Sequence, residues 1–179
     1  ANKEGIPTFK EMAADYGVEV KGYSTNAAFV DYDNDGDLDL YVVTNKTTKR
    51  YAPSNYHDKV ADVNSPNNDR LYRNDWNATL GHPIFTDVSK EAGVLAEGFG
   101  LGINICDLNR DGWKDIYVTN DFITNDLVWI NNQNGTFTNQ AKNVVKHTSH
   151  SAMGIDINDI NNDGLSDIVT LDMMPEDNY

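Results

Sequence analysis

DYDNDGDLDL, which runs from Asp31 to Leu40, places five aspartates at alternating positions around one glycine. Carboxylates crowded this closely repel one another. The same pattern, D-x-[DN]-x-D-G-x-x-D, recurs at Asp107–Asp115 and at Asp159–Asp167. A pattern kept three times despite its repulsion indicates a function for the clustered charge.

The three acidic stretches belong to a longer repeat. A phenylalanine lies 22 residues before each of them, at Phe9, Phe85 and Phe137. The spacing between the second and third copies gives a repeat of about 52 residues, and the first copy is 24 residues longer. Alignment of RLYRN with LVWIN places most of the extra residues in an insertion at about residues 45–68.

Each repeat reads as β-structure. Short runs rich in Val, Ile and Tyr flank the acidic stretch and are bounded by Gly, Asn and Asp, and two further runs follow them. Four strands in a repeat of this length are typical of a propeller blade. The chain is therefore predicted to be a single incomplete all-β domain over residues 1–179, built from four-stranded antiparallel blades.

The predicted blades have definite bounds. Residues 7–12 are predicted to be the outer strand of a preceding blade, 24–88 and 100–140 to be full blades, and 152–172 to be the inner two strands of a next one. The Ala-rich segments between blades permit one helical turn, which Gly17 and Gly93 would end. Because a propeller must close to remove its exposed edges, we expect this chain to be part of a larger chain or complex.

Calcium accounts for the acidic pattern. Calcium takes six to eight oxygen ligands in a flexible shell, and a nine-residue loop can supply them if alternate residues point inward. The glycine makes the sharp turn, and the seventh position, which is Asp, Trp or Leu in the three copies, would contribute its backbone carbonyl. Three sites are predicted, with these ligand positions: Asp31, Asp33, Asp35, Asp37 and Asp39; Asp107, Asn109, Asp111, Trp113 and Asp115; Asp159, Asn161, Asp163, Leu165 and Asp167.

Other interpretations of the pattern fit less well. An EF-hand would need Glu at position twelve between helices, but the chain has Val42, Val118 or Thr170 there, within β runs. Magnesium prefers fewer protein ligands, and zinc would need nitrogen or sulfur. Asx-rich hairpin turns without an ion remain the alternative, and three copies in the same phase argue against it.

Composition limits the partners. Lys and Arg number 14 against 28 Asp and Glu, a formal charge of −14, which argues against nucleic acid or an anionic membrane as a partner. No apolar run approaches the ~20 residues of a membrane-spanning helix.

These residues resemble the FG-GAP/VCBS repeat family. The resemblance rests on the acidic motif, on GFG at residues 98–100, on the LYRN and FTDVSKEAGV segments, and on LDMMPEDN at residues 171–178. It is nearest to the cartilage-acidic-protein-like group that also carries an ASPIC/UnbV domain, although that domain and the GAP half of the motif have no match here. The resemblance implies a fragment of a seven-bladed, integrin-α-like propeller, with calcium between the first and second strands of a blade. It also implies a secreted or cell-surface location, which in a bacterium would be the periplasm or the outer-membrane surface.

The insertion is the predicted partner surface. It concentrates basic and tyrosine side chains, of which Lys49, Arg50, Tyr51 and Tyr56 are the predicted contacts. It lies between the second and third strands of its blade, so it should stand on the face away from calcium. The alternative is a solvated loop packed on its own blade.

No nucleophile elbow or Cys–His pairing is present, so the sequence predicts a non-enzymatic module. Its expected function is that of a calcium-binding extracellular or cell-surface propeller module that binds a protein or a glycan. The alternative is the calcium-stabilised propeller of a polysaccharide-degrading enzyme such as a lyase, which would need Arg, His, Tyr or Lys gathered near calcium.

Overall fold

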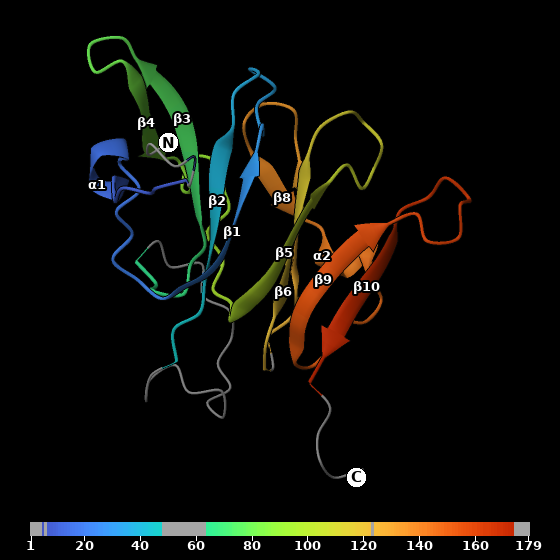
Figure 1. The fold of residues 1–179 in the computed structure, drawn as a ribbon. Helices are drawn as coiled ribbons and strands as arrows, with labels where there is room; N and C mark the ends of the chain where they lie inside the picture. The colour runs from blue at the N-terminus through green and yellow to red at the C-terminus, as the bar shows by residue number, and fades with distance from the viewer. Residues whose placement is uncertain (1–4, 6, 48–63, 123, 174–179) are drawn as a thin grey trace.

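The computed structural model describes residues 5, 7–47, 64–122 and 124–173, and within them nearly all of the regular secondary structure is β-strand (Figure 1). In this part of the chain, ten strands and two short helices follow one another. The helices are α1 (Ala13–Tyr16) and α2 (Ala141–Val144). The strands are β1 (Ser24–Val30), β2 (Asp39–Thr44), β3 (Arg70–Asn77), β4 (His82–Asp87), β5 (Gly100–Cys106), β6 (Asp115–Asn120), β7 (Leu127–Asn131), β8 (Phe137–Asn139), β9 (Ala152–Asn158) and β10 (Asp167–Asp172).

The strands form antiparallel sheets in simple sequence order. One four-stranded sheet has the order β1-β2-β3-β4, a second has the order β5-β6-β7-β8, and β9 pairs with β10. We refer to the two complete sheets as blade A and blade B, and to the β9–β10 pair as blade C. This confirms the predicted all-β fold of four-stranded antiparallel blades.

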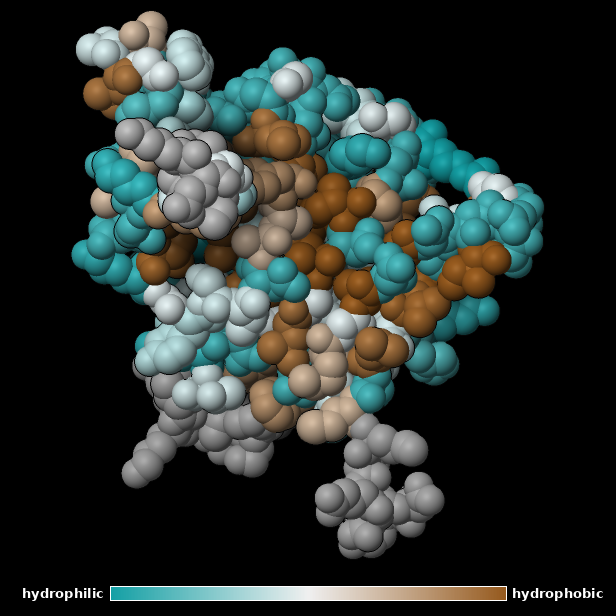
Figure 2. All heavy atoms as spheres, in the orientation of Figure 1, coloured by the Kyte–Doolittle hydropathy of each residue, from teal (hydrophilic) through white to brown (hydrophobic). Residues whose placement is uncertain are grey.

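The first strands of the three blades lie next to one another. Strand β5 packs against β1 on one side and against β9 on the other (Figure 1). The face on which these strands lie carries many apolar side chains (Figure 2). Exposed apolar residues of these strands include Phe29 on β1 and Met153 on β9. The blades are thus arranged side by side around their first strands, as consecutive propeller blades are.

The hydrophobic core lies between blades. One cluster joins blade A to blade B through buried residues such as Tyr41, Leu71, Ile116 and Trp129. A second cluster, built on Tyr117 and Val128, packs against partly buried isoleucines of blade C. Each blade therefore depends on its neighbour to bury its apolar faces.

Hydrogen bonds also cross the junction between blades A and B. The Trp129 indole N–H donates to the Tyr41 hydroxyl over 3.1 Å, and that hydroxyl donates to Asp69 over 3.0 Å. The Asn131 amide donates to the Tyr32 carbonyl over 2.7 Å. The bonds from Trp129 to Tyr41 and from Asn131 to Tyr32 form only when the two blades are in register, so they help fix how the blades meet.

The segment before blade A differs in part from the prediction. Gly17 ends the single turn of α1 in the left-handed conformation (φ 78°), as expected. Residues 7–12, predicted to be an outer strand, have no regular secondary structure, and Phe9 is 97% exposed. A strand requires a hydrogen-bonded neighbour, and none of the pairings among the described residues involves this segment.

The two ends of each blade are chemically different. The acidic stretches connect β1 to β2, β5 to β6 and β9 to β10. The described flanks of the insertion, residues 45–47 and 64–69, connect β2 to β3 and so lie at the opposite end of blade A (Figure 1). Most of the insertion, including Lys49, Arg50, Tyr51 and Tyr56, lies outside the described residues.

Candidate calcium sites in the acidic loops

The three acidic loops have the same backbone conformation. Each begins after its first strand and ends where the paired aspartate opens the second, as in the Val30–Asp39 pair. The fourth residue is left-handed in every copy, with φ of 58° at Asn34, 63° at Arg110 and 60° at Asn162. The sixth residue, the motif glycine, has φ of 95°, 89° and 80° in turn. Glycine tolerates this region without steric cost, which explains its place in the motif.

The first aspartate of each loop holds the turn together. Its carboxylate accepts the N–H of the motif glycine, over 3.2 Å at Asp31, 2.9 Å at Asp107 and 2.7 Å at Asp159. The carboxylate at position five accepts the N–H at position seven in the same way. The loops therefore contain the Asx turns of the alternative interpretation, and that geometry alone does not require an ion.

The first loop has carboxylate oxygens that these turns leave unused. One oxygen each of Asp31, Asp33 and Asp37 is buried and accepts no hydrogen bond. Oxygens of Asp31, Asp33 and Asp39 lie within 4.8 Å of one another, the one such group among the described residues. A buried, unpaired carboxylate oxygen is costly unless a cation or a proton satisfies it.

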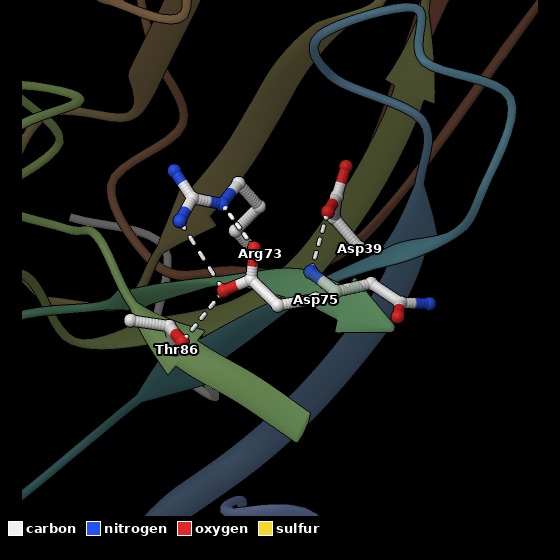
Figure 3. Close-up of polar contacts among 5 residues, drawn as sticks. Asp39, Arg73, Asp75 and Thr86 are labelled. Carbon is white, nitrogen blue, oxygen red and sulfur yellow. Dashed lines mark hydrogen bonds and ion pairs between the residues drawn. The ribbon is translucent and has the colours of Figure 1, made fainter. Parts of the chain in front are cut away.

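The ninth position has a second role that the sequence did not indicate. The Asp39 carboxylate is fully buried and accepts the N–H of Tyr32 over 3.2 Å and the N–H of Asn74, on β3, over 2.8 Å (Figure 3). Asp115 repeats both bonds, to Leu108 over 2.9 Å and to Asn131 over 2.8 Å. This aspartate thus ties the loop to the third strand, and the second lone pair of each oxygen is left for an ion.

Electrostatics in the first loop favour protons or cations. Burial, and then the charge of Asp35, raise the pKa of the Asp33 carboxyl. Burial also raises the pKa of Asp37, and it raises that of Asp39 to about 7. A cation placed among these carboxylates would stabilise their ionised forms and so oppose the rise in pKa that burial and carboxylate repulsion cause.

The second and third loops offset their charge with an amide. Asn109 donates its side-chain N–H to Asp111 over 2.9 Å, and Asn161 donates to Asp163 over 3.1 Å. Asp111 also accepts from Gln133 over 3.0 Å, and that bond is the main cause of its lowered pKa. Asp33 cannot donate in this way, so the first loop keeps the largest uncompensated charge.

The structure thus brings together only some of the predicted ligands. Asp31, Asp33 and Asp39 meet in the first loop, whereas Asp35 is exposed. In the second loop the side chain of Trp113 borders a cleft between blades A and B. Arg73 lines the same cleft. The sequence did not predict it as a site residue, because a single arginine on a strand belongs to no recognisable motif.

Taken together, repeated four-stranded antiparallel blades with an acidic loop between their first two strands define a blade-repeat protein of the propeller class. Comparison with known families agrees, because residues 107–170, which hold the second and third acidic loops, match the model of the FG-GAP-like repeat. Residues 107–170 are therefore an FG-GAP-like repeat.

The chain is also similar to a curated protein. The chain is 37% identical to integrin alpha-6 from Homo sapiens over 84 residues, which are 41% of this chain and 7% of that protein. The chain therefore spans only a small part of the length of this relative. Within the described residues, no helix is long and apolar enough to cross a membrane.

Proposed function

We propose that this chain is a calcium-binding, non-enzymatic propeller module that binds a protein or a glycan outside the cell or at its surface. The observation that carries the calcium proposal is the first loop. Three of its carboxylates each leave a buried oxygen without a hydrogen bond, and oxygens of Asp31, Asp33 and Asp39 lie within 4.8 Å. Hard carboxylate oxygens in this number suit calcium.

The remaining predicted ligands complete the proposal. The second and third loops share the backbone conformation of the first, so each would hold one further calcium ion through its aspartates and the Asn109 or Asn161 carbonyl oxygen. Calcium would supply the positive charge that offsets carboxylate repulsion at this end of the blades. Isothermal calorimetry of the full chain should detect three sites, and an absence of calcium uptake would refute the proposal.

The location and partner class are inferred from similarity. FG-GAP-like repeats and the match to integrin alpha-6 support an extracellular or cell-surface setting and a binding role. In this chain the insertion would supply the contacts, because its flanks lie at the end of blade A away from the acidic loops.

The partner surface can be tested by substitution. Replacing Lys49, Arg50 and Tyr51 together with Ala should abolish capture of a cell-surface partner by the full chain while leaving calcium binding unchanged. Replacing Lys90 and Lys142, which lie outside both the insertion and the acidic loops, with Ala provides the matched control for lost positive charge. Partner capture that survives the triple substitution would contradict the assignment of this surface.

A further inference from the structure

A cleft of about 430 Å³ lies between blades A and B, at the end that carries the acidic loops. Buried Tyr32 and Ala92 form its inner part. The partly exposed side chains of Arg73 and Trp113 line it from opposite blades, and the β7–β8 turn, residues 133–136, completes it. Small-molecule sites are concave, combine apolar surface with a few polar groups, and often lie where two structural units meet.

The repeat itself shows that the lining of this cleft is unusual. At the junction between blades B and C, the residues equivalent to Tyr32, Arg73 and Trp113 are Leu108, Ile130 and Leu165. Leu108 and Ile130 belong to the apolar cluster of that junction. Aliphatic residues at these positions are therefore sufficient for the fold. Tyr, Arg and Trp occur at the junction between blades A and B and not at that between blades B and C, which indicates a role beyond packing.

Arg73 is held in place before any ligand arrives. Its guanidinium donates two hydrogen bonds to Asp75, from Nε over 2.8 Å and from Nη2 over 3.2 Å (Figure 3). Asp75 in turn accepts the Thr86 hydroxyl over 2.7 Å. An arginine fixed by one edge presents its other N–H groups in a defined direction, which lowers the entropy lost on binding.

The charge around the cleft restricts the ligand. Asp75 neutralises Arg73, and Glu91 adds negative charge to the lining. An anionic ligand would be repelled there, whereas a neutral ligand with many hydroxyl groups would find donors on Arg73, an acceptor on Glu91 and an aromatic surface on Trp113.

We propose that this cleft binds a neutral saccharide of one or two rings, with a C–H face of the sugar against Trp113 and its hydroxyl groups bonded to Arg73 and Glu91. The site is separate from the insertion at the other end of blade A, and it stands whether or not the insertion binds a partner. A ligand of this size should bind with a Kd on the order of 1 mM.

The test is saturation-transfer NMR on the full chain in calcium-containing buffer, with glucose, galactose, mannose and N-acetylglucosamine as probes. At least one sugar should receive saturation. The variants Arg73→Ile and Trp113→Leu place at each position the residue that the neighbouring repeat already uses, so the fold is retained. Each should weaken binding at least fivefold, and the double variant should abolish it.

The control is Trp76→Leu, which removes a 65% exposed tryptophan outside the cleft and should leave the signal unchanged. Calcium uptake measured on the same samples distinguishes loss of sugar binding from loss of calcium binding by the acidic loops. Arg73 lies outside the acidic loops, so Arg73→Ile tests the sugar site even if Trp113→Leu disturbs the second loop. No transfer to any of the four sugars, or transfer that persists in the double variant, would overturn the proposal.

Discussion

At the third position of the acidic loop, the choice between an amide and a carboxylate side chain sets how much charge the loop carries. Asn109 and Asn161 each donate an N–H to the carboxylate two residues later, and so remove part of the repulsion without an ion. Asp33 has no such donor, and one of its oxygens is buried and unpaired. The first loop should therefore bind calcium more tightly than the other two.

Substitution at this position tests the ranking. Asp33→Asn removes one ligand charge and gives the first loop the donor of the other two, so its calcium affinity should fall roughly tenfold, as ligand charge tunes such sites. Asn109→Asp is the matched reverse change and should tighten the second loop. Chelator-competition titrations would measure both. A first loop that is already the weakest in the unmodified chain would refute the ranking.

The raised pKa of Asp39 makes the calcium-free chain sensitive to pH. Burial raises this pKa from 3.8 to about 7, so the folded state binds a proton more tightly than the unfolded chain does. The stability that this proton contributes is complete below about pH 4 and is lost as the pH rises through about 7. In chelator, the melting temperature should therefore fall between pH 5 and pH 7.5.

Calcium should reverse this trend, because it binds the ionised carboxylate and competes with the proton. With calcium present, the melting temperature should hold or rise over the same pH range. Asp39→Asn removes the titrating group and should flatten the profile measured in chelator. A calcium-free melting temperature that climbs steadily from pH 5 to pH 7.5 would show that Asp39 does not titrate as described.

At the scale of the strand, the packing of β5 on β9 depends on a residue without a side chain. A methyl group added at Gly102 would lie 2.5 Å from the Thr119 hydroxyl oxygen and 3.0 Å from the Gly154 Cα. Gly154 occupies the equivalent position one repeat later, yet a methyl group there would meet nothing closer than 4.0 Å. The two glycines share a place in the repeat but differ in the space around them.

Alanine substitutions at Gly102 and at Gly154 test this difference in space. Gly102→Ala should lower the free energy of unfolding by about 1–3 kcal/mol, because backbone of the neighbouring strand would have to move. Gly154→Ala should change it by less than about 0.5 kcal/mol. Urea unfolding monitored by circular dichroism would measure both. Equal effects of the two substitutions would contradict the close approach of β5 and β9.

Most of the strands and loops could be predicted from the sequence, because strand periodicity and the repeat depend on local residue chemistry. Gly17 ends a helical turn where expected, and the acidic loops join the first two strands of each blade. What could not be predicted depends on contacts between distant segments. Asp39 bonds to Asn74 across 35 residues, and Arg73 and Trp113 line one cleft only because two blades pack together. Residues 7–12 form no strand among the described residues, because a strand needs a hydrogen-bonded neighbour and the preceding blade is not among them.

At the scale of the whole molecule, hydrogen bonds connect the acidic loops to the strands that form the core. Asp39 and Asp115 each bond to the third strand of their own blade, and those strands contribute Leu71 and Trp129 to the cluster between blades A and B. Carboxylate repulsion in an ion-free loop therefore acts on a residue that holds the core strands in register. Calcium should consequently stabilise the chain as a unit and not only its loops.

Removal of calcium tests this connection. If each loop binds calcium with a Kd of ~10⁻⁴ M, then ~1 mM calcium adds on the order of 1.4 kcal/mol per site through mass action alone. An excess of chelator should lower the melting temperature of the full chain, and the core should respond together with the loops. In a chain carrying Trp76→Leu and Trp113→Leu, the fluorescence of buried Trp129 reports the core alone. That signal and far-ultraviolet circular dichroism should then show one shared transition that moves with calcium concentration. Magnesium at the same concentration is the control and should restore little of the lost stability, because it holds its waters and prefers fewer protein ligands. A melting temperature that is unchanged by chelator, or a loop transition that moves while the Trp129 signal does not, would show that the acidic loops do not stabilise the blades.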